Sequence, residues 1–296
     1  MINRPLSAII HPGENGNRAP YAVILGTNEI ASAVAVRLHK RGYGVTMSHD
    51  PLPPVIRRKM AFHDALFDDP VTLAGVAAER IDSGADLPAF LSARTAVAIT
   101  ELGLLDLIVV RKLDLLIDAR MQKHQMRPDL RHLADFTIGL GPGFHVDRNC
   151  DFAIETMPGK AGTILRHGST EPADGTFRLL ADRGGERFVY STMPGRWHTA
   201  IDIGSRVFRN YIVGYLGNTP IQAPFDGILR GVVRDGTEAP AGVKLLEVDP
   251  RMRGAVWTGI DDRAHGIAIA VEQALDLRRE TCVAVINSRK SAMPGP

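Results

Sequence analysis

Two side chains with reactive or charged groups, Cys150 and Arg120, follow short apolar runs and are the residues of this sequence best suited to chemistry. A thiolate at Cys150 could pass on sulfur or ligate a metal, and Glu155 lies five positions further along. The planar fork of Arg120, next to Asp118, could hold a phosphate or a carboxylate. A structural alternative stays open for each, since free cysteines are often buried as small apolar residues and an aspartate can pair internally with a nearby arginine.

A glycine-rich turn lies between these side chains. Gly139, Gly141 and Gly143 would let the backbone approach an anionic ligand, although tight turns alone explain them equally well. The turn belongs to residues 118–156, where we expect the ligand site. Apolar runs at 113–117, 136–140 and 152–154 each stop at charged, small or Gly/Pro residues. This pattern is typical of buried strands that end in ligand-contacting loops.

An incomplete dinucleotide-binding turn opens the patterned part of the chain. A strand at 21–25 is followed by Gly26, a helix-like segment, a second strand at 45–47 and then Asp50. In the Gly-x-Gly-x-x-Gly/Ala fingerprint, Asn28 replaces the second glycine and carries a side chain where pyrophosphate normally approaches. Gly26, Asn28 and Asp50 are candidate NAD(P) contacts. Alternatively, the turn only packs the helix on the sheet.

The segments that follow continue an α/β pattern. We predict helices at 62–67 and 71–79 and a strand at 87–91, whereas 97–110 is strongly apolar without a clear type. Before them, the densest basic cluster of the chain includes Arg57 and Arg58. These two arginines could hold one anionic ligand.

The pattern changes after residue 172 to short strands separated by Gly, Pro and Asn turns, which is all-β patterning. The glycine-rich strings there resemble the barrel-sandwich domains that carry biotin or lipoate. The expected hairpin tip at 217–220 has no lysine, which counts against a swinging-arm role. A closing helix is predicted at 261–275. The predicted organisation is a lead-in (1–20), a Rossmann-like α/β domain (21–172), a β-rich domain (173–255), a helical return (256–287) and a tail (288–296).

Composition excludes several classes of protein. The net charge is +2, with basic and acidic residues intermixed, so a nucleic-acid partner is not expected. Two cysteines and the absence of a membrane-length apolar run or a signal region predict a cytoplasmic protein without a disulfide framework. The histidines show no metal-ligand spacing, and no phosphate loop or nucleophile elbow is present.

The chain resembles the YqeB family, described as accessory proteins of selenium-dependent molybdenum hydroxylase systems and distantly similar to xanthine dehydrogenase accessory proteins. The strings that carry the resemblance are 26–32, 51–52, 56–58, Phe62, 118–121, Lys123, 138–144, Cys150, 154–156, 223–231 and 248–251. The resemblance implies a role in maturing a molybdenum hydroxylase by handling the molybdopterin cofactor or its sulfur or selenium ligand. The implied partners are that client enzyme and a phosphate-bearing cofactor.

The sequence is therefore compatible with three functions. The first is a maturation factor that binds its cofactor between the α/β and β-rich domains. The second is an NAD(P)-dependent oxidoreductase, and the third is a scaffold that docks a partner hydroxylase. A homo-oligomer is compatible with each of them.

Overall fold

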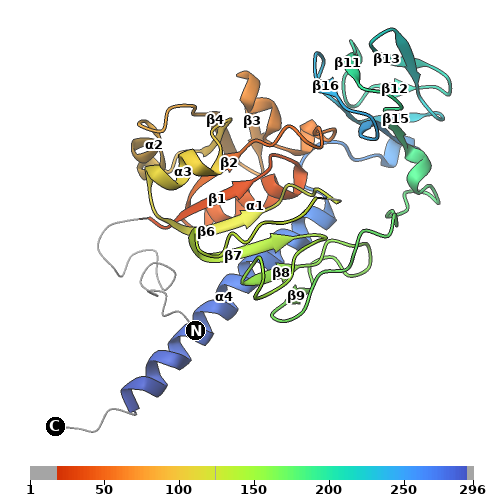
Figure 1. The fold of residues 1–296 in the computed structure, drawn as a ribbon. Coiled ribbons are helices and arrows are strands. Elements are labelled where there is room, and N and C mark those ends of the chain that lie inside the picture. The colour runs from red at the N-terminus through yellow and green to blue at the C-terminus, as the bar shows by residue number, and fades with distance from the viewer. Residues whose placement is uncertain (1–18, 124, 292–296) are drawn as a thin grey trace.

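The computed structural model describes residues 19–123 and 125–291, with side chains to residue 283 (Figure 1). Residues 1–18 of the predicted lead-in (1–20), His124 and the last part of the predicted tail, 292–296, lie outside the described residues. A nine-stranded sheet has the order β3-β4-β5-β2-β1-β6-β7-β8-β9. Its interior pairs are parallel, and the edge strands β3 and β9 are antiparallel to their neighbours. The chain is thus a mixed α/β protein.

The predicted strands of the α/β region are confirmed as β1 (Tyr21–Leu25), β2 (Gly44–Ser48), β6 (Leu113–Asp118), β7 (Ala134–Leu140) and β8 (Phe152–Ile154). The other strands of this sheet are β3 (Val71–Leu73), β4 (Val76–Arg80), β5 (Val97–Thr100) and β9 (Ile164–Leu165). Short 3-10 helices occupy Arg58–Met60 (η1) and His63–Phe67 (η2).

Two predictions for this region are wrong. Residues 71–79 form the hairpin β3–β4 instead of a helix, because Ala74 and Gly75 both have positive φ and turn the chain. Residues 87–91 belong to the helix α2 (Leu87–Ala93) instead of a strand. Leu87 and Leu91 lie one helical turn apart and are both buried. The ambiguous run at 97–110 divides at Gly103 into β5 and α3 (Leu104–Val110).

Helices cover both faces of the sheet. α1 (Glu29–Lys40) and the long α4 (Asp262–Ser291) share one apolar core with the inward side chains Ala22 and Ile24 of β1. α2 and α3 cover the opposite face, where the alternate residues Val23 and Leu25 point. α4 extends beyond the predicted closing helix and runs past the sheet edge, as Figure 1 shows.

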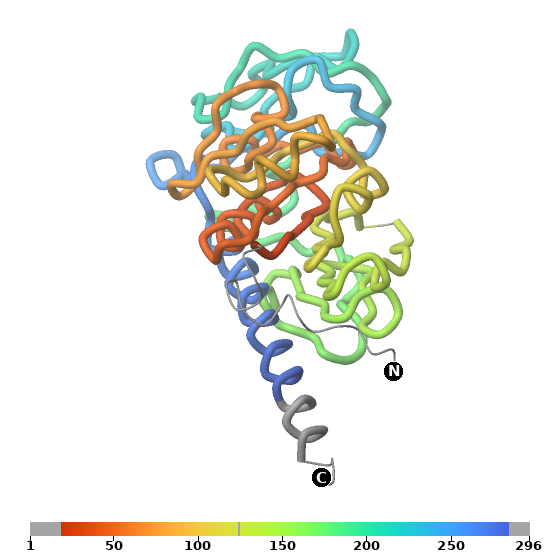
Figure 2. The backbone as a smooth tube through the Cα atoms, turned by 90° about the vertical axis from the view of Figure 1, so that its left-hand side faces the viewer, coloured from red at the N-terminus to blue at the C-terminus, as the bar shows by residue number. Residues whose placement is uncertain are grey.

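The β-rich region contains two four-stranded antiparallel sheets around a separate apolar core. Their strands are β10 (Phe188–Tyr190), β11 (Gly195–His198), β12 (Arg206–Val207), β13 (Ile212–Leu216), β14 (Thr219–Gln222), β15 (Gly227–Val232), β16 (Glu238–Ala239) and β17 (Lys244–Asp249). Short 3-10 turns lie at Gly185–Arg187 (η3) and Met252–Gly254 (η4). The views in Figures 1 and 2 place this region at one end of the α/β sheet, opposite the far end of α4. No helix in the described residues is long and apolar enough to span a membrane.

Candidate functional site

The switch point of the sheet, where β1 is flanked by β2 on one side and β6 on the other, is closed by protein groups. Asn28 Oδ1 accepts from the backbone N–H groups of Ile30 and Ala31, at 3.0 and 3.1 Å. Its Nδ2 donates to the Ala119 carbonyl at 2.6 Å. Gly26 has φ +105, and a Cβ there would lie 3.0 Å from that carbonyl. The amides that would bind a pyrophosphate are therefore used inside the protein.

The Arg120 fork is also bonded internally. Its Nε and Nη2 donate to the two oxygens of buried Asp118, at 3.0 and 2.6 Å. Asp50 lies 3.6 Å from Arg120 Nη1 and accepts from Gln122 Nε2 at 2.9 Å. The structure thus brings Asp50, Asp118 and Arg120 together, as one ion-paired group. This arrangement matches the structural alternative for Arg120, in which Asp118 pairs internally with the arginine.

The glycine turn packs tightly against side chains. A Cβ at Gly139 would lie 2.1 Å from the Phe144 ring, and one at Gly141 would lie 2.9 Å from Thr156 Oγ1. Gly141 and Gly143 both have positive φ, as a tight turn requires. Close packing and turn geometry account for all three glycines.

Cys150 is buried in a small apolar cluster with Phe144, Val146 and Ala153. Burial, aided by Asp151, raises the pKa of its thiol to about 12. At neutral pH the sulfur is protonated and enclosed, which is the environment of a packing cysteine. Glu155 is also buried, and its carboxylate accepts the backbone N–H groups of residues 156, 157 and 171.

Arg57 and Arg58 both reach the β-rich region. Arg58 donates to Asp64 Oδ2 at 2.6 Å and to the Val232 carbonyl at 3.0 Å. Arg57 donates from Nη1 to Glu29 at the start of α1, at 2.8 Å, and from Nε to Glu247 of β17, at 2.7 Å. Arg57 is therefore the predicted site residue that leads into a buried ion network between the two regions.

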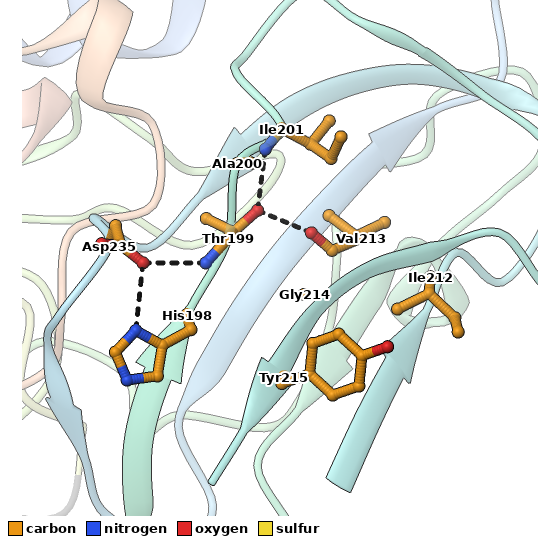
Figure 3. Close-up of a pocket in the computed structure, with 9 residues that line it drawn as sticks. All are labelled: His198, Thr199, Ala200, Ile201, Ile212, Val213, Gly214, Tyr215 and Asp235. Carbon is orange, nitrogen blue, oxygen red and sulfur yellow. Dashed lines mark hydrogen bonds and ion pairs between the residues drawn. The ribbon is translucent and has the colours of Figure 1, made fainter. Parts of the chain in front are cut away.

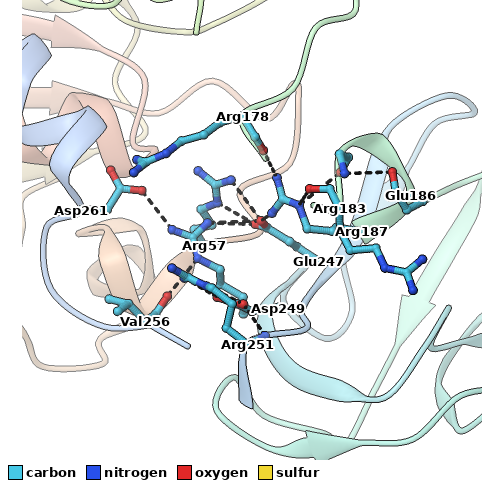
Figure 4. Close-up of polar contacts among 12 residues, drawn as sticks. Arg57, Arg178, Arg183, Glu186, Arg187, Glu247, Asp249, Arg251, Val256 and Asp261 are labelled. Carbon is cyan, nitrogen blue, oxygen red and sulfur yellow. Dashed lines mark hydrogen bonds and ion pairs between the residues drawn. The ribbon is translucent and has the colours of Figure 1, made fainter. Parts of the chain in front are cut away.

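Glu247, whose side chain is fully buried, is the centre of this network between the two regions (Figure 4). Besides Arg57, Arg230 contacts both of its carboxylate oxygens at 3.2 Å. Arg187 also donates to Glu247 Oε1. Burial by itself would raise the pKa of Glu247, but Arg57 and Arg230 lower it to about 2. Glu247 is therefore ionised at neutral pH.

Two outer carboxylates complete a balanced set. Glu29 pairs with Arg57, and Asp261, next to the start of α4, pairs with Arg230 Nη2 at 2.9 Å. With Glu247, they compensate Arg57, Arg187 and Arg230 charge for charge.

Two further cations face this network without a carboxylate of their own among the described residues. Arg263 of α4 donates only to the neutral Thr156 carbonyl, at 2.8 and 3.2 Å, and burial lowers its pKa. Burial, reinforced by repulsion from Arg57 and Lys123, also lowers the pKa of Lys244 to about 7. Both interact electrostatically with Arg57 and Glu29. We call the following set the seam: Glu29, Arg57, Arg187, Arg230, Lys244, Glu247, Asp261 and Arg263.

The seam carries more positive charge than its carboxylates compensate. Its fixed guanidinium groups are suited to phosphate or carboxylate recognition. A half-enclosed surplus of cations is unfavourable without a counter-charge. The chemistry that this arrangement can support is anion binding.

A concave feature lies on the β-rich region, away from the seam (Figure 3). His198 Nδ1 lies 3.4 Å from Asp235 Oδ1, and the half-exposed Tyr215 and Ile212 form the opposite wall. In the described residues no group of three or more His, Cys, Asp or Glu side chains is placed to hold a metal. The Figure 3 pocket is open and mostly apolar, unlike the seam.

Comparison with known proteins supplies the family. The chain is 31% identical over 264 residues to the Uncharacterized protein YqeB of Escherichia coli (strain K12), a match that covers 86% of this chain and 47% of the relative. The chain belongs to the YqeB family. It spans about half the length of that curated relative. No protein-family model matches it.

Solved structures show only a remote likeness to this YqeB-family chain. An aspartoacylase family protein from Mesorhizobium loti MAFF303099 is 12% identical, covering 78% of this chain and 85% of its own, with a TM-score of 0.26. The Ectoine utilization protein EutE (DoeB) from Ruegeria pomeroyi is 11% identical, covering 78% and 86%, with a TM-score of 0.24. Similarity this low carries no argument about activity.

Sequence reasoning missed most of the seam of this YqeB-family member. Arg230 and Glu247 are each flanked in their strands by apolar or glycine residues, and a charged residue at such a position signals a buried ion pair. Arg187, Lys244 and Arg263 lie at element ends and give no comparable signal in the sequence.

Proposed function

We propose that this chain binds a phosphate-bearing anionic cofactor at the seam and serves in the maturation of a molybdenum hydroxylase. The observation that carries the anion-binding part is the pair of uncompensated cations, Arg263 and Lys244, beside a charge-balanced network. An anion would neutralise this surplus, which consists of the full charge of Arg263 and the partial charge of Lys244, whose pKa is about 7. The molybdenum client rests on membership of the YqeB family and on the implied role of that family.

The residues present fit a molybdopterin-type group through its phosphate. Arg263, which among the described residues donates only to the neutral Thr156 carbonyl, would hold the phosphate, because a guanidinium fork matches its oxygen geometry. When bound, such a cofactor supplies the dithiolene sulfurs that carry molybdenum. The chain itself would bind and orient the group and keep water away with the aromatic rings next to Lys244.

The β-rich region would form one wall of this site. We propose that its two antiparallel sheets make a barrel-sandwich domain of the biotinyl and lipoyl kind that no longer acts as a carrier. The hairpin between β13 and β14 turns at Gly217 and Asn218, and no lysine is present there. This domain instead directs Arg187, Arg230 and Lys244 toward the α/β sheet.

Trp257 is a natural reporter for a test. The preceding residue, Val256, accepts a hydrogen bond from Arg230 Nε at 2.9 Å, so the backbone at Trp257 adjoins the seam while its ring packs near Gly204. Titration with inorganic pyrophosphate should change its fluorescence saturably, and Arg263→Ala should weaken the apparent affinity. Arg206→Ala is the matched control, because Arg206 is exposed on β12 and stacks on Phe208 outside the seam.

The client prediction has a separate test. Protein purified from cells that make a molybdenum hydroxylase should release a phosphate-bearing pterin on denaturation, detected by mass spectrometry together with metal analysis. Saturable pyrophosphate binding without any released pterin would support the anion-binding proposal and contradict the molybdenum role. A pyrophosphate titration that never saturates would contradict both the anion-binding proposal and the molybdenum role.

A scaffold role is the second candidate. It is favoured by large apolar side chains exposed on the β-rich region, among them Phe208, Tyr211 and Tyr215. Co-purification with a hydroxylase that is lost in Tyr215→Ser but retained in Arg263→Ala would favour docking over cofactor handling. An oxidoreductase reading is disfavoured by Asn28, which occupies the amides that NAD(P) would need.

A further inference from the structure

Lys244 differs from the other seam cations in its chemistry. A guanidinium stays protonated, whereas a lysine amine can lose its proton and act as a nucleophile. Lys244 is the first residue of β17, and its Nζ lies 3.6 Å from the centroid of the Phe188 ring and 5.2 Å from that of Phe177. The two rings pack against each other with centroids 5.4 Å apart, and the amine lies beside this aromatic pair, at the edge of the proposed anion site.

Among the residues whose side chains the structure describes, none is a polar partner of the Lys244 nitrogen. Within residues 19–123 and 125–283, Lys244 Nζ makes neither a hydrogen bond nor a salt bridge. The Phe188 ring attracts an ammonium group, but it cannot replace the hydrogen bonds that water gives to three N–H donors.

Neighbouring charges act on the same amine in both directions. Burial lowers its pKa most, Arg57 and Lys123 lower it further, and Glu247 and Glu29 partly oppose the change, for a pKa of about 7. Near neutral pH a large share of Lys244 is therefore the free amine. Lys160 is the opposite case, since it is exposed, pairs with Glu171 at 2.8 Å and has a raised pKa.

We propose that Lys244 captures the aldehyde or ketone of a phosphate-bearing ligand as an imine, while Arg263 holds the phosphate. The amine nitrogen attacks the carbonyl carbon, and the electron pair of the C=O π bond moves to oxygen, which takes up a proton. The resulting carbinolamine loses one water molecule to give C=N. The overall change is amine plus carbonyl to imine plus water, without any oxidant or reductant. This inference rests on the anion site proposed above but not on its molybdenum client.

Pyridoxal 5′-phosphate is a suitable probe because it carries both an aldehyde and a phosphate. The full chain is incubated with a limiting amount near neutral pH, reduced with borohydride to a stable secondary amine, and mapped by peptide mass spectrometry. Lys244 should be labelled at least about tenfold faster than Lys160, because only the free amine reacts. Its labelling should reach half of its maximum near pH 7.

Matched variants and competitors complete the design. Lys244→Arg keeps a positive charge and should abolish the main adduct, with folding checked by circular dichroism, whereas Lys160→Arg should leave it unchanged. Inorganic phosphate should slow the labelling of Lys244, and pyridoxal, which lacks the phosphate, should react more slowly than its phosphate ester.

The outcomes separate the two proposals. If Lys160 reacts as fast as Lys244 while pyrophosphate still changes Trp257 fluorescence saturably, the imine inference is overturned and the anion site stands. If pyridoxal labels Lys244 as fast as its phosphate ester does and phosphate does not compete, the amine is reactive without an anion site, and both proposals fall as stated.

Discussion

Replacing Glu247 by glutamine should destabilise the chain and at the same time strengthen its affinity for anions. Glu247→Gln keeps the size of the side chain and removes one buried negative charge from the centre of Arg57, Arg187 and Arg230. Those guanidinium groups then repel each other with less compensation. The same added positive charge should attract phosphate more strongly.

The structure sets the size of the effect. The pKa of Glu247 falls from its ordinary 4.5 to about 2, and each pKa unit corresponds to about 1.4 kcal/mol, which gives about 3 kcal/mol. Removal of one partner from a buried ion pair typically costs about 3–5 kcal/mol, which agrees. At about 2–4 °C per kcal/mol for a chain of this size, Tm should fall by roughly 6–12 °C.

Thermal unfolding followed by circular dichroism measures this change, with and without phosphate. Phosphate should raise the Tm of Glu247→Gln more than that of the wild type, because a ligand that binds only the folded state stabilises it in proportion to its affinity. Glu171→Gln is the control. Glu171 is half-exposed and pairs with Lys160, so its loss should change Tm little.

The stability difference between wild type and Glu247→Gln should also depend on pH. A carboxylate with a depressed pKa stabilises the folded state fully above its unfolded pKa, and this contribution is lost as the pH falls toward the folded pKa. The difference in unfolding free energy between wild type and Glu247→Gln should be constant above about pH 4.5 and vanish toward pH 2. Equal stability of the two proteins at neutral pH would refute the electrostatic reasoning.

Three further predictions concern the residues around the switch point and the glycine turn. Asn28→Ala should lower the unfolding free energy by about 1–2 kcal/mol in urea titrations, because the helix cap is lost; no change would contradict the capping role. Gly139→Ala should lower the unfolding free energy by about 1–3 kcal/mol, because the added Cβ would overlap with Phe144. Gly266→Ala should raise the unfolding free energy by about 0.5–1 kcal/mol, because a Cβ at this position of α4 would meet no atom within 4 Å. Cys150 should react with a thiol reagent only after unfolding. Rapid labelling of Cys150 itself in the native protein would disprove its buried state.

Local patterns predicted much of the α/β region. The strands at 21–25, 113–117, 136–140 and 152–154 are confirmed because buried parallel strands are continuously apolar. The helix and strand predictions at 71–79 and 87–91 failed because both segments are short. Their type was decided by the Ala74-Gly75 turn and by packing of Leu87 and Leu91.

The sequence by itself determined the strand, turn and helix order around Gly26 and the likeness to the YqeB family. The tertiary structure alone decided which charges meet. Arg57, Glu247 and Arg263 are separated by many residues and come from a loop, a β-rich strand and the last helix. Whether these charges compensate one another depends on distances and burial that no sequence spacing encodes. The physical reason is that electrostatic energy follows spatial separation and local dielectric, so the proposed anion site forms only when the two regions pack together.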